Sequence, residues 1–118
     1  MDNEIKIVPL ENCKSYSFDY VVCSNKISII RENCIYFQRG VIALLGNPKE
    51  VNIGIDEQNK AMLIIPADTR LRTKKYVVKS KHIYCREVIA KIRQITKSKI
   101  FEVTFDRDLG GLLVKLGD

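Results

Sequence analysis

Two stretches of the chain nearly repeat each other, and this repetition constrains the fold more than any other feature of the sequence. Residues 34–45 read CIYFQRGVIALL, and residues 82–92 read HIYCREVIAKI. If Gly40 is omitted, Ile-Tyr aligns with Ile-Tyr, and Val-Ile-Ala aligns with Val-Ile-Ala. A unit of this size is too small to bury its own apolar face, so it must pack against another. The sequence therefore predicts two similar units packed together.

The similarity extends to the segments that follow each stretch. Residues 51–65 and 101–115 both alternate apolar and polar residues, turn at an acidic loop and return as a second apolar run, which is typical of a hairpin. Asp56 and Asp106 occupy corresponding positions in the two turns, 50 residues apart. We expect Gly110 or Gly111 to take a positive φ in the second turn.

Each unit is predicted to contain one helix between its two strand pairs. The spacing of apolar residues predicts a short helix over Gln38–Leu45 and a longer one over Arg86–Lys97. We therefore expect a mainly β protein of the α+β class. Its two tandem strand-strand-helix-strand-strand units would form one small barrel or a sheet covered by helices.

The whole chain, residues 1–118, is expected to form a single domain. The first unit is predicted over residues 26–66 and the second over 76–118, joined by a basic loop at 67–75. Residues 1–25, which alternate around Tyr16, Phe18 and Tyr20, are expected to add N-terminal strands.

Composition places the protein among ordinary soluble proteins, with 46% hydrophobic and 29% charged residues. No apolar run is long enough to cross a membrane, and the N-terminus lacks the pattern of a secretory signal. We therefore expect a cytoplasmic protein without a membrane partner.

The four cysteines form no CxxC pair, and His82 lies three residues before Cys85, which in a strand puts the two on opposite faces. Reduced, partly buried thiols are expected, with no metal and no cofactor.

Positive charge is concentrated in one segment. Residues 70–99 contain eleven lysines and arginines and one acid, Glu87, whereas the rest of the chain contains nine bases and thirteen acids. Such a field can be a solvated surface, but crowded like charges favour a polyanionic partner, of which a nucleic-acid backbone is the commonest.

The predicted long helix places Arg86, Arg93 and Lys97 on one stripe, away from its apolar face. We expect this stripe, the basic loop and the following turn to contact phosphates. The predicted nucleic-acid-binding residues are Arg70, Arg72, Lys74, Lys75, Lys79, Lys81, Arg86, Arg93 and Lys97.

Two tyrosines, Tyr36 and Tyr84, hold corresponding positions in the repeated stretches. They are compatible with two interpretations: packing between strands, or stacking of bases on a sheet beside a basic surface.

Signals of catalysis in the sequence are weak. There is one histidine, no glycine-rich phosphate loop and no nucleophile elbow. Asp106 and Asp108 are better explained by a hairpin turn than by a metal-binding nuclease pair. We therefore expect no enzyme.

The duplicated layout over residues 26–118 resembles the swapped-hairpin fold of AbrB-like transition-state regulators, and two copies in one chain resemble the MraZ type. The resemblance implies an interleaved DNA-binding barrel. The Gly-Arg and Ile-Pro motif of that family is not present in RENCIYF or KSKHIYC, so no binding residue is transferred. A second division of the chain, into four strands and a helix over 4–46 and again over 51–97, resembles PUR and Whirly-type single-strand binders.

The primary hypothesis is a small non-catalytic nucleic-acid-binding protein, a DNA-binding regulator. The competing hypothesis is a protein-interaction module of a phage or mobile element, an inhibitor or accessory factor whose cationic face docks on an acidic partner. The sequence is compatible with a homodimer.

Overall fold

The computed structural model describes residues 25–117 and is mainly β. In this part of the chain, eight strands and two helical segments follow one another. They are β1 (Lys26–Ile30), β2 (Cys34–Phe37), the 3₁₀ helix η1 (Ile42–Leu45), β3 (Glu50–Asp56), β4 (Ala61–Pro66), β5 (Lys75–Lys79), β6 (His82–Tyr84), α2 (Arg86–Arg93), β7 (Ile100–Asp106) and β8 (Gly111–Lys115). The N-terminal strands predicted before residue 25 lie outside the described residues.

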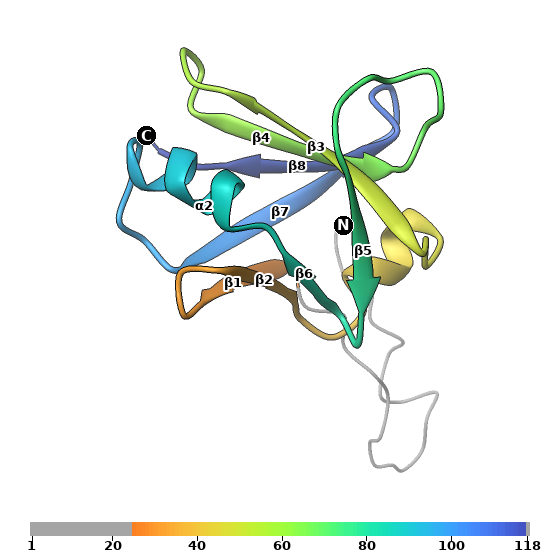
Figure 1. Cartoon of the computed structure of the whole chain (residues 1–118), viewed down its shortest axis with the longest axis horizontal. Coiled ribbons are helices and arrows are strands. Elements are labelled where there is room, and N and C mark those ends of the chain that lie inside the picture. The colour runs from red at the N-terminus through yellow and green to blue at the C-terminus, as the bar shows by residue number, and fades with distance from the viewer. Residues whose placement is uncertain (1–24, 118) are drawn as a thin grey trace, which may run out of the picture.

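The strands form a closed antiparallel barrel. Neighbouring strands follow the order β1-β2-β6-β5-β3-β4-β8-β7, and β7 returns to β1. Figure 1 shows the strands enclosing a common interior, with α2 at one end of the barrel and η1 (yellow) at the other. The pair β2–β6 therefore lies on the opposite wall from the pair β4–β8. Of the two predicted arrangements, the described residues form the barrel.

Alternation along each strand divides the side chains between the core and the outer surface. On β4, Met62 and Ile64 point inward and are fully buried, and on β8 Leu112 and Val114 do the same. Ile27, Phe37 and other fully buried side chains of β1, β2 and β6 fill the rest of the interior. The predicted mainly β class is thus confirmed. The period-two pattern in the sequence corresponds to the alternation of inward and outward side chains along the strands.

The strand registers of residues 26–66 match those of residues 75–115, and we call these two segments the halves of the barrel. Ile27 of β1 lies opposite Phe101 of β7, and Tyr76 of β5 lies opposite Val51 of β3. The turn at Asp106 also follows the prediction, since Gly110 has φ 72°.

Two ladders join the halves, and each has corresponding residues at its centre. Ile35 lies opposite Ile83 in β2–β6, and Leu63 lies opposite Leu113 in β4–β8. These partners are 48 and 50 residues apart, which are the separations of Tyr36 from Tyr84 and of Asp56 from Asp106.

Both predicted helices are shorter than expected. The first was predicted over Gln38–Leu45, but Gly40 (φ 83°) and Gly46 (φ 82°) adopt left-handed conformations and leave a 3₁₀ turn at Ile42–Leu45 between them. Positive φ is accessible to glycine and interrupts a right-handed helix.

The second helix was predicted to reach Lys97, but it ends at Arg93. The Arg93 guanidinium donates to the carbonyl oxygens of Thr96 (3.2 Å) and Ser98 (2.7 Å). These bonds draw the chain back toward the helix end, so Lys97 lies beyond α2 and the predicted helical stripe is wrong at that residue.

Candidate nucleic-acid interface

The charge excess of the described residues is larger than that of the whole chain. Residues 25–117 contain 18 lysines and arginines and nine acids. Four of those acids form ion pairs with bases: Asp68 with Arg70, Glu87 with Lys74, Glu57 with Lys91 and Glu32 with Arg93. Fourteen bases therefore have no ion pair with another described residue, against five acids.

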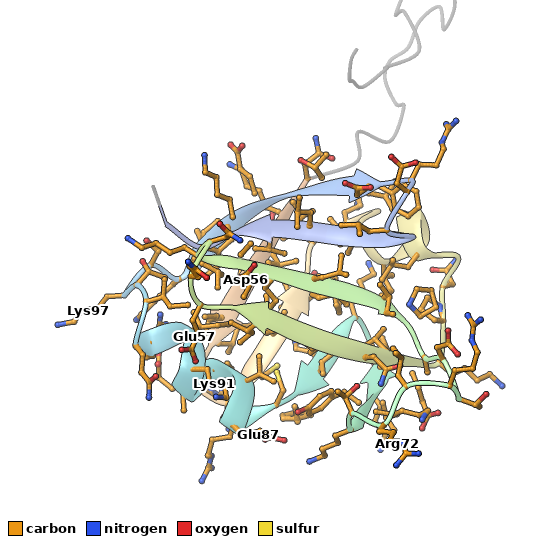
Figure 2. All side chains as sticks on the ribbon, turned by 90° about the horizontal axis from the view of Figure 1, so that it is seen from above. Asp56, Glu57, Arg72, Glu87, Lys91 and Lys97 are labelled. Carbon is orange, nitrogen blue, oxygen red and sulfur yellow. The ribbon has the colours of Figure 1, made fainter. Side chains whose placement is uncertain are left out.

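The predicted phosphate contacts are spread over the molecule and do not form one patch. Figure 2 shows Arg72 and Lys97 at opposite ends of the long dimension. Because α2 ends at Arg93, Lys97 also no longer extends a helical ridge from Arg86. A single interface cannot use all nine predicted residues at once.

Arg70 and Arg72 lie in the loop that connects β4 to β5. Arg70 is held by Asp68, whose carboxylate accepts three hydrogen bonds from its guanidinium at 2.7–3.2 Å. This side-chain contact lowers the pKa of Asp68 to about 2. Arg72 is exposed and has no ion pair with a described residue.

The same loop is fixed to β3 by Asn52, the one buried polar side chain of the described residues. Its Oδ1 accepts from the amide of Asp68 (2.8 Å), and its Nδ2 donates to Thr73 Oγ1 (3.1 Å). Nδ2 also lies 3.3 Å from the carbonyl oxygens of Thr73 and Lys74. The backbone of the basic loop is therefore anchored at both ends.

Lys74, the residue directly before β5, forms an ion pair with Glu87 of α2. Its ammonium lies 3.0 Å from Glu87 Oε2, which also accepts a hydrogen bond from the Tyr76 hydroxyl at 2.8 Å. The backbone amide of Glu87, the Tyr76 hydroxyl and Lys74 lower the pKa of Glu87 to about 2. Burial, then the contact with Glu87, raises the pKa of Tyr76. Lys74 is thus neutralised by a structural contact.

Arg93 is also a structural residue in this geometry. Its side chain is only 21% exposed, and it donates to both carboxylate oxygens of Glu32, in the β1–β2 turn, at 2.6 and 2.8 Å. Together with the carbonyl contacts to Thr96 and Ser98, this joins the end of α2 to β1–β2. A bidentate, partly buried guanidinium has little capacity left for phosphate.

The remaining predicted lysines of β5 lie on the outer wall of the barrel. Tyr76 and Val78 face the interior, so alternation places Lys75, Val77 and Lys79 outward. Neither lysine has an ion pair with a described residue. Lys81 follows in the turn and Arg86 begins α2; both are exposed.

Across this wall, the ladder register aligns a cation with two rings. Lys79 lies opposite His82, and His82 lies opposite Tyr36. Tyr84, two residues along β6, faces outward with 66% of its surface exposed. We call this surface the β2–β6 face, made up of Tyr36, Lys75, Val77, Lys79, His82 and Tyr84.

The His82 ring is held in a defined orientation. Its Nδ1 lies 2.8 Å from the Ser80 carbonyl oxygen, which can only accept, so Nδ1 carries the proton and donates. The ring centroid lies 4.9 Å from that of Tyr36, with the planes inclined by 44°. The sequence prediction for His82 concerned only a metal site, so its pairing with Tyr36 was not predicted. The available signal was strand alternation, which places His82 and Tyr84 on the same face of their strand.

The opposite wall has a different character. There the outward residues Leu63 and Leu113 meet at the centre of the β4–β8 ladder, beside Gly54 of β3 and Thr104 of β7. This wall is neutral at its centre and has no aromatic ring there.

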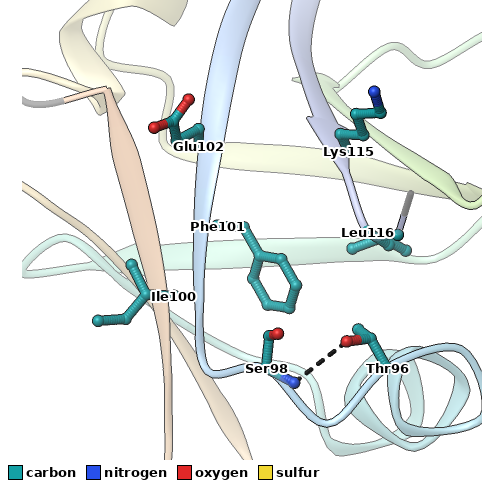
Figure 3. Close-up of a pocket in the computed structure, with 8 residues that line it drawn as sticks. Thr96, Ser98, Ile100, Phe101, Glu102, Lys115 and Leu116 are labelled. Carbon is teal, nitrogen blue, oxygen red and sulfur yellow. Dashed lines mark hydrogen bonds between the residues drawn. The ribbon is translucent and has the colours of Figure 1, made fainter.

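A hollow beside β7 and the end of β8 offers little chemistry. This hollow has a volume of about 380 Å³. In Figure 3 the Phe101 ring lies between Ser98 and Leu116, with Glu102 and Lys115 at the margin. The amide of Ser98 donates to Thr96 Oγ1 at 3.2 Å. The chain's one histidine lies on the β2–β6 wall, away from this hollow. We see no nucleophile–base pair here.

Among the described residues, no group of three metal-ligating side chains is close enough to hold an ion. Cys34 and Cys85 are free and buried, and burial raises the pKa of Cys85 to about 12. Cys13 and Cys23 lie outside the described part of the chain. No helix between residues 25 and 117 has the length and apolarity needed to cross a membrane.

Comparison with known proteins finds no matching family model, no matching curated protein and no matching solved structure. Function is therefore argued from the geometry of the β2–β6 face.

Proposed function

We propose that this chain is a non-catalytic nucleic-acid-binding protein of the cytoplasm, acting as a DNA-binding regulator, and that the β2–β6 face is its binding surface. The observation that carries this proposal is the cross-strand row Lys79–His82–Tyr36, in which a lysine without an ion pair to any residue of 25–117 adjoins aromatic rings. Phosphate groups need exposed cations, and bases offer apolar faces and polar edges. The β2–β6 face presents matching groups for both.

Charge on this face is available because most nearby acids are already paired. Glu87 is paired with Lys74, and Asp68 with Arg70. Lys75 and Lys79 lie four residues apart on one strand, about 13 Å at the usual rise of a strand. Cations held on a rigid strand can displace condensed counterions from a phosphate backbone without first being ordered. Lys81 and Arg86 extend the cationic surface beyond the two ends of β6.

We also infer that the barrel consists of two tandem strand-strand-helix-strand-strand units related by an internal two-fold axis. The matched registers support this. An exchange of the two units places Ile27 on Tyr76 and Phe101 on Val51, and both Ile27–Phe101 and Tyr76–Val51 are cross-strand pairs. The axis would pass through the pairs Ile35–Ile83 and Leu63–Leu113. On this interpretation the β2–β6 face lies at one exit of the axis, where both units contribute to one surface.

The decisive experiment measures binding to random-sequence single-stranded and duplex oligonucleotides at 50 and 200 mM salt by fluorescence anisotropy. If Lys75, Lys79, Lys81 and Arg86 each contact a phosphate, affinity should fall by about 50-fold for single strands and about 150-fold for duplexes over this range. The double variant Lys75→Glu/Lys79→Glu should bind much more weakly and with a smaller salt slope.

The matched control is Arg107→Glu/Lys115→Glu, which changes the net charge equally but lies in the β7–β8 hairpin on another wall. It should retain binding with only a small loss. Absence of binding by the wild-type protein at 50 mM, or equal losses in both double variants, would disprove the proposal.

A second candidate function is docking on an acidic partner protein. It is favoured by exposed apolar side chains on and beside the same face, since Val77 is 50% and Ile100 59% exposed. Ile100 lies opposite Ser28 on β1, next to the strand that carries Tyr36. In that case the wild-type chain would bind no oligonucleotide, yet would bind an acidic protein with affinity that depends on Lys75 and Lys79.

A further inference from the structure

We infer that the β2–β6 face binds unpaired bases of a single-stranded nucleic acid, with Tyr84 as the main stacking residue and the Tyr36–His82 pair as a second stacking position. This inference rests on the proposed function, because stacking adds to phosphate contacts and does not replace them.

Tyr84 presents an exposed ring at the last residue of β6. Its partner across the β2–β6 ladder is Cys34, which is buried, so no side chain of comparable size stands opposite it on β2. On the other side, the β5–β6 register places it next to Val77, a small apolar side chain. Tyr84 has no ring contact with another described residue, and a ring left exposed between two smaller neighbours can accept a base on its face.

The second position is already assembled. His82 is fixed by its bond to Ser80 and by contact with Tyr36, so these rings present a defined edge and face without further ordering. Binding that requires little ordering of side chains retains more of its interaction energy. Lys79 stands opposite His82, in position to contact the phosphate of a nucleotide stacked there.

Spacing favours single strands over duplexes. His82 and Tyr84 are two residues apart on β6, which corresponds to about 7 Å along a strand. Neighbouring nucleotides in a duplex rise by about 3.4 Å per strand and cover each other's faces. Bases can therefore occupy both positions only when they are separated from each other and unpaired.

Charge complementarity favours a polyanion over an apolar protein surface as the occupant. Lys75 and Lys79 flank Val77 along β5, and the exposed acid that borders this strip is Glu50, opposite Val77 on β3. The nucleic-acid backbone is thus expected to follow β5, on the side of β6 that carries the lysines.

The test compares three ligands of equal length: a 12-nucleotide oligothymidylate, a fully abasic strand and a duplex. The abasic strand keeps the phosphates and removes the bases. We expect the oligothymidylate to bind at least about fivefold more tightly than the abasic strand, as one stacked base should provide, and more tightly than the duplex. Since the chain contains no tryptophan, its fluorescence comes from its five tyrosines, and quenching that disappears in Tyr84→Leu reports stacking on Tyr84.

Two substitutions that each remove a ring while keeping an apolar side chain provide matched variants. Tyr84→Leu should weaken oligothymidylate binding by about 5- to 150-fold, the range for loss of one stacked base, whereas Tyr84→Phe should bind like the wild type. Phe105→Leu removes another exposed ring, on β7, and should leave affinity unchanged. Abasic binding should be the same in all variants.

Equal affinity for oligothymidylate and the abasic strand, or equal effects of Tyr84→Leu and Phe105→Leu, would overturn the stacking inference while the proposed function stands. Tighter binding to the duplex than to the single strand would also overturn it. If none of the three ligands binds at 50 mM salt, the proposed function and this inference fail together.

Discussion

The two halves of the barrel share strand registers but use corresponding positions differently. Asn52 of β3 and Glu102 of β7 are equivalent in register, since Asn52 lies opposite Lys75 and Glu102 lies opposite Lys26. Asn52 is 2% exposed and holds the β4–β5 loop, whereas Glu102 is exposed at the margin of the hollow beside Phe101. The comparison shows that a covering loop, and not the strand register, decides which polar side chain a position needs.

The helical segments differ in the same way. α2 buries Val88, Ile89 and Ile92 over two turns, whereas η1 buries Ile42 and Leu45 in one turn. Glycines bracket the shorter segment, and none interrupts α2. A few residues thus change how each half covers its end of the barrel, while the ladders remain alike.

The largest contrast between the halves should appear when Asn52 and Glu102 are each replaced by alanine. Asn52→Ala leaves the Asp68 amide and the loop carbonyl oxygens without their partner, and several lost bonds at 1–3 kcal/mol per buried group give a destabilisation of about 3 kcal/mol. Glu102→Ala should cost less than about 0.5 kcal/mol, as is usual at the surface. Urea denaturation of both variants measures the difference, and equal midpoints would show that the loop contributes no anchoring.

A smaller contrast is expected at Gly111 and its counterpart Ala61, the first residues of β8 and β4. A Cβ atom at Gly111 would lie 2.4 Å from the Ile64 carbonyl oxygen and 2.5 Å from Ile65 Cγ2. Gly111→Ala should therefore destabilise the fold by about 2 kcal/mol through overpacking.

In the other half, Ala61→Gly should cost only about 0.5–1 kcal/mol, from backbone entropy. Thermal unfolding compares the two variants. A Gly111→Ala protein as stable as wild type would mean that β4 and β8 can separate at this point.

The smallest effect concerns the acid stability of the contact between the second-half strand β5 and α2. The folded pKa of Glu87 is about 2, below the unfolded value of about 4.3, so its ionised form stabilises the fold above that unfolded value. This contribution should be lost as the pH falls from about 4.3 through 2.

Because the Glu87–Lys74 pair is more than half exposed, we expect less than about 1 kcal/mol. The difference in unfolding free energy between the wild type and Glu87→Gln, measured from pH 6 to pH 2, should be constant above pH 5 and shrink progressively toward pH 2, where Glu87 is about half ionised in the folded protein. A difference that does not change with pH would exclude ionisation as its cause.

Much of the local structure could be predicted from the sequence because it depends on local signals. Alternation located β3, β4, β7 and β8, and the acidic turns located the hairpins, in which Asp56 accepts from the Asn59 amide and Asp106 from the Leu109 amide. The helix ends were wrong because they depend on distant or conformational effects. The bonds from Arg93 to Glu32 span 61 residues, and no periodicity reveals them.

The sequence identified cations of the candidate site, but it did not predict which side chains lie next to one another. Counting charge identified Lys75 and Lys79, but it could not distinguish them from Lys74 and Arg93, whose acids come from other elements. His82 was overlooked because its neighbour on the wall, Tyr36, is 46 residues away and becomes adjacent only through the β2–β6 ladder. Cross-strand neighbours depend on register, which is a tertiary property.

Closure of the barrel has a consequence for how the protein is made. The strand that begins the described part, β1, completes its hydrogen bonding only by pairing with β7, between residues such as Ile27 and Phe101. During synthesis, residues 26–66 therefore emerge from the ribosome with unsatisfied strand edges, and the edges of β1 and β4 stay unpaired until β7 and β8 have been made. Pairings of such large sequence separation form slowly, so the barrel should close only after β7 and β8 have been synthesised, and the emerging first half should be the stage most prone to aggregation.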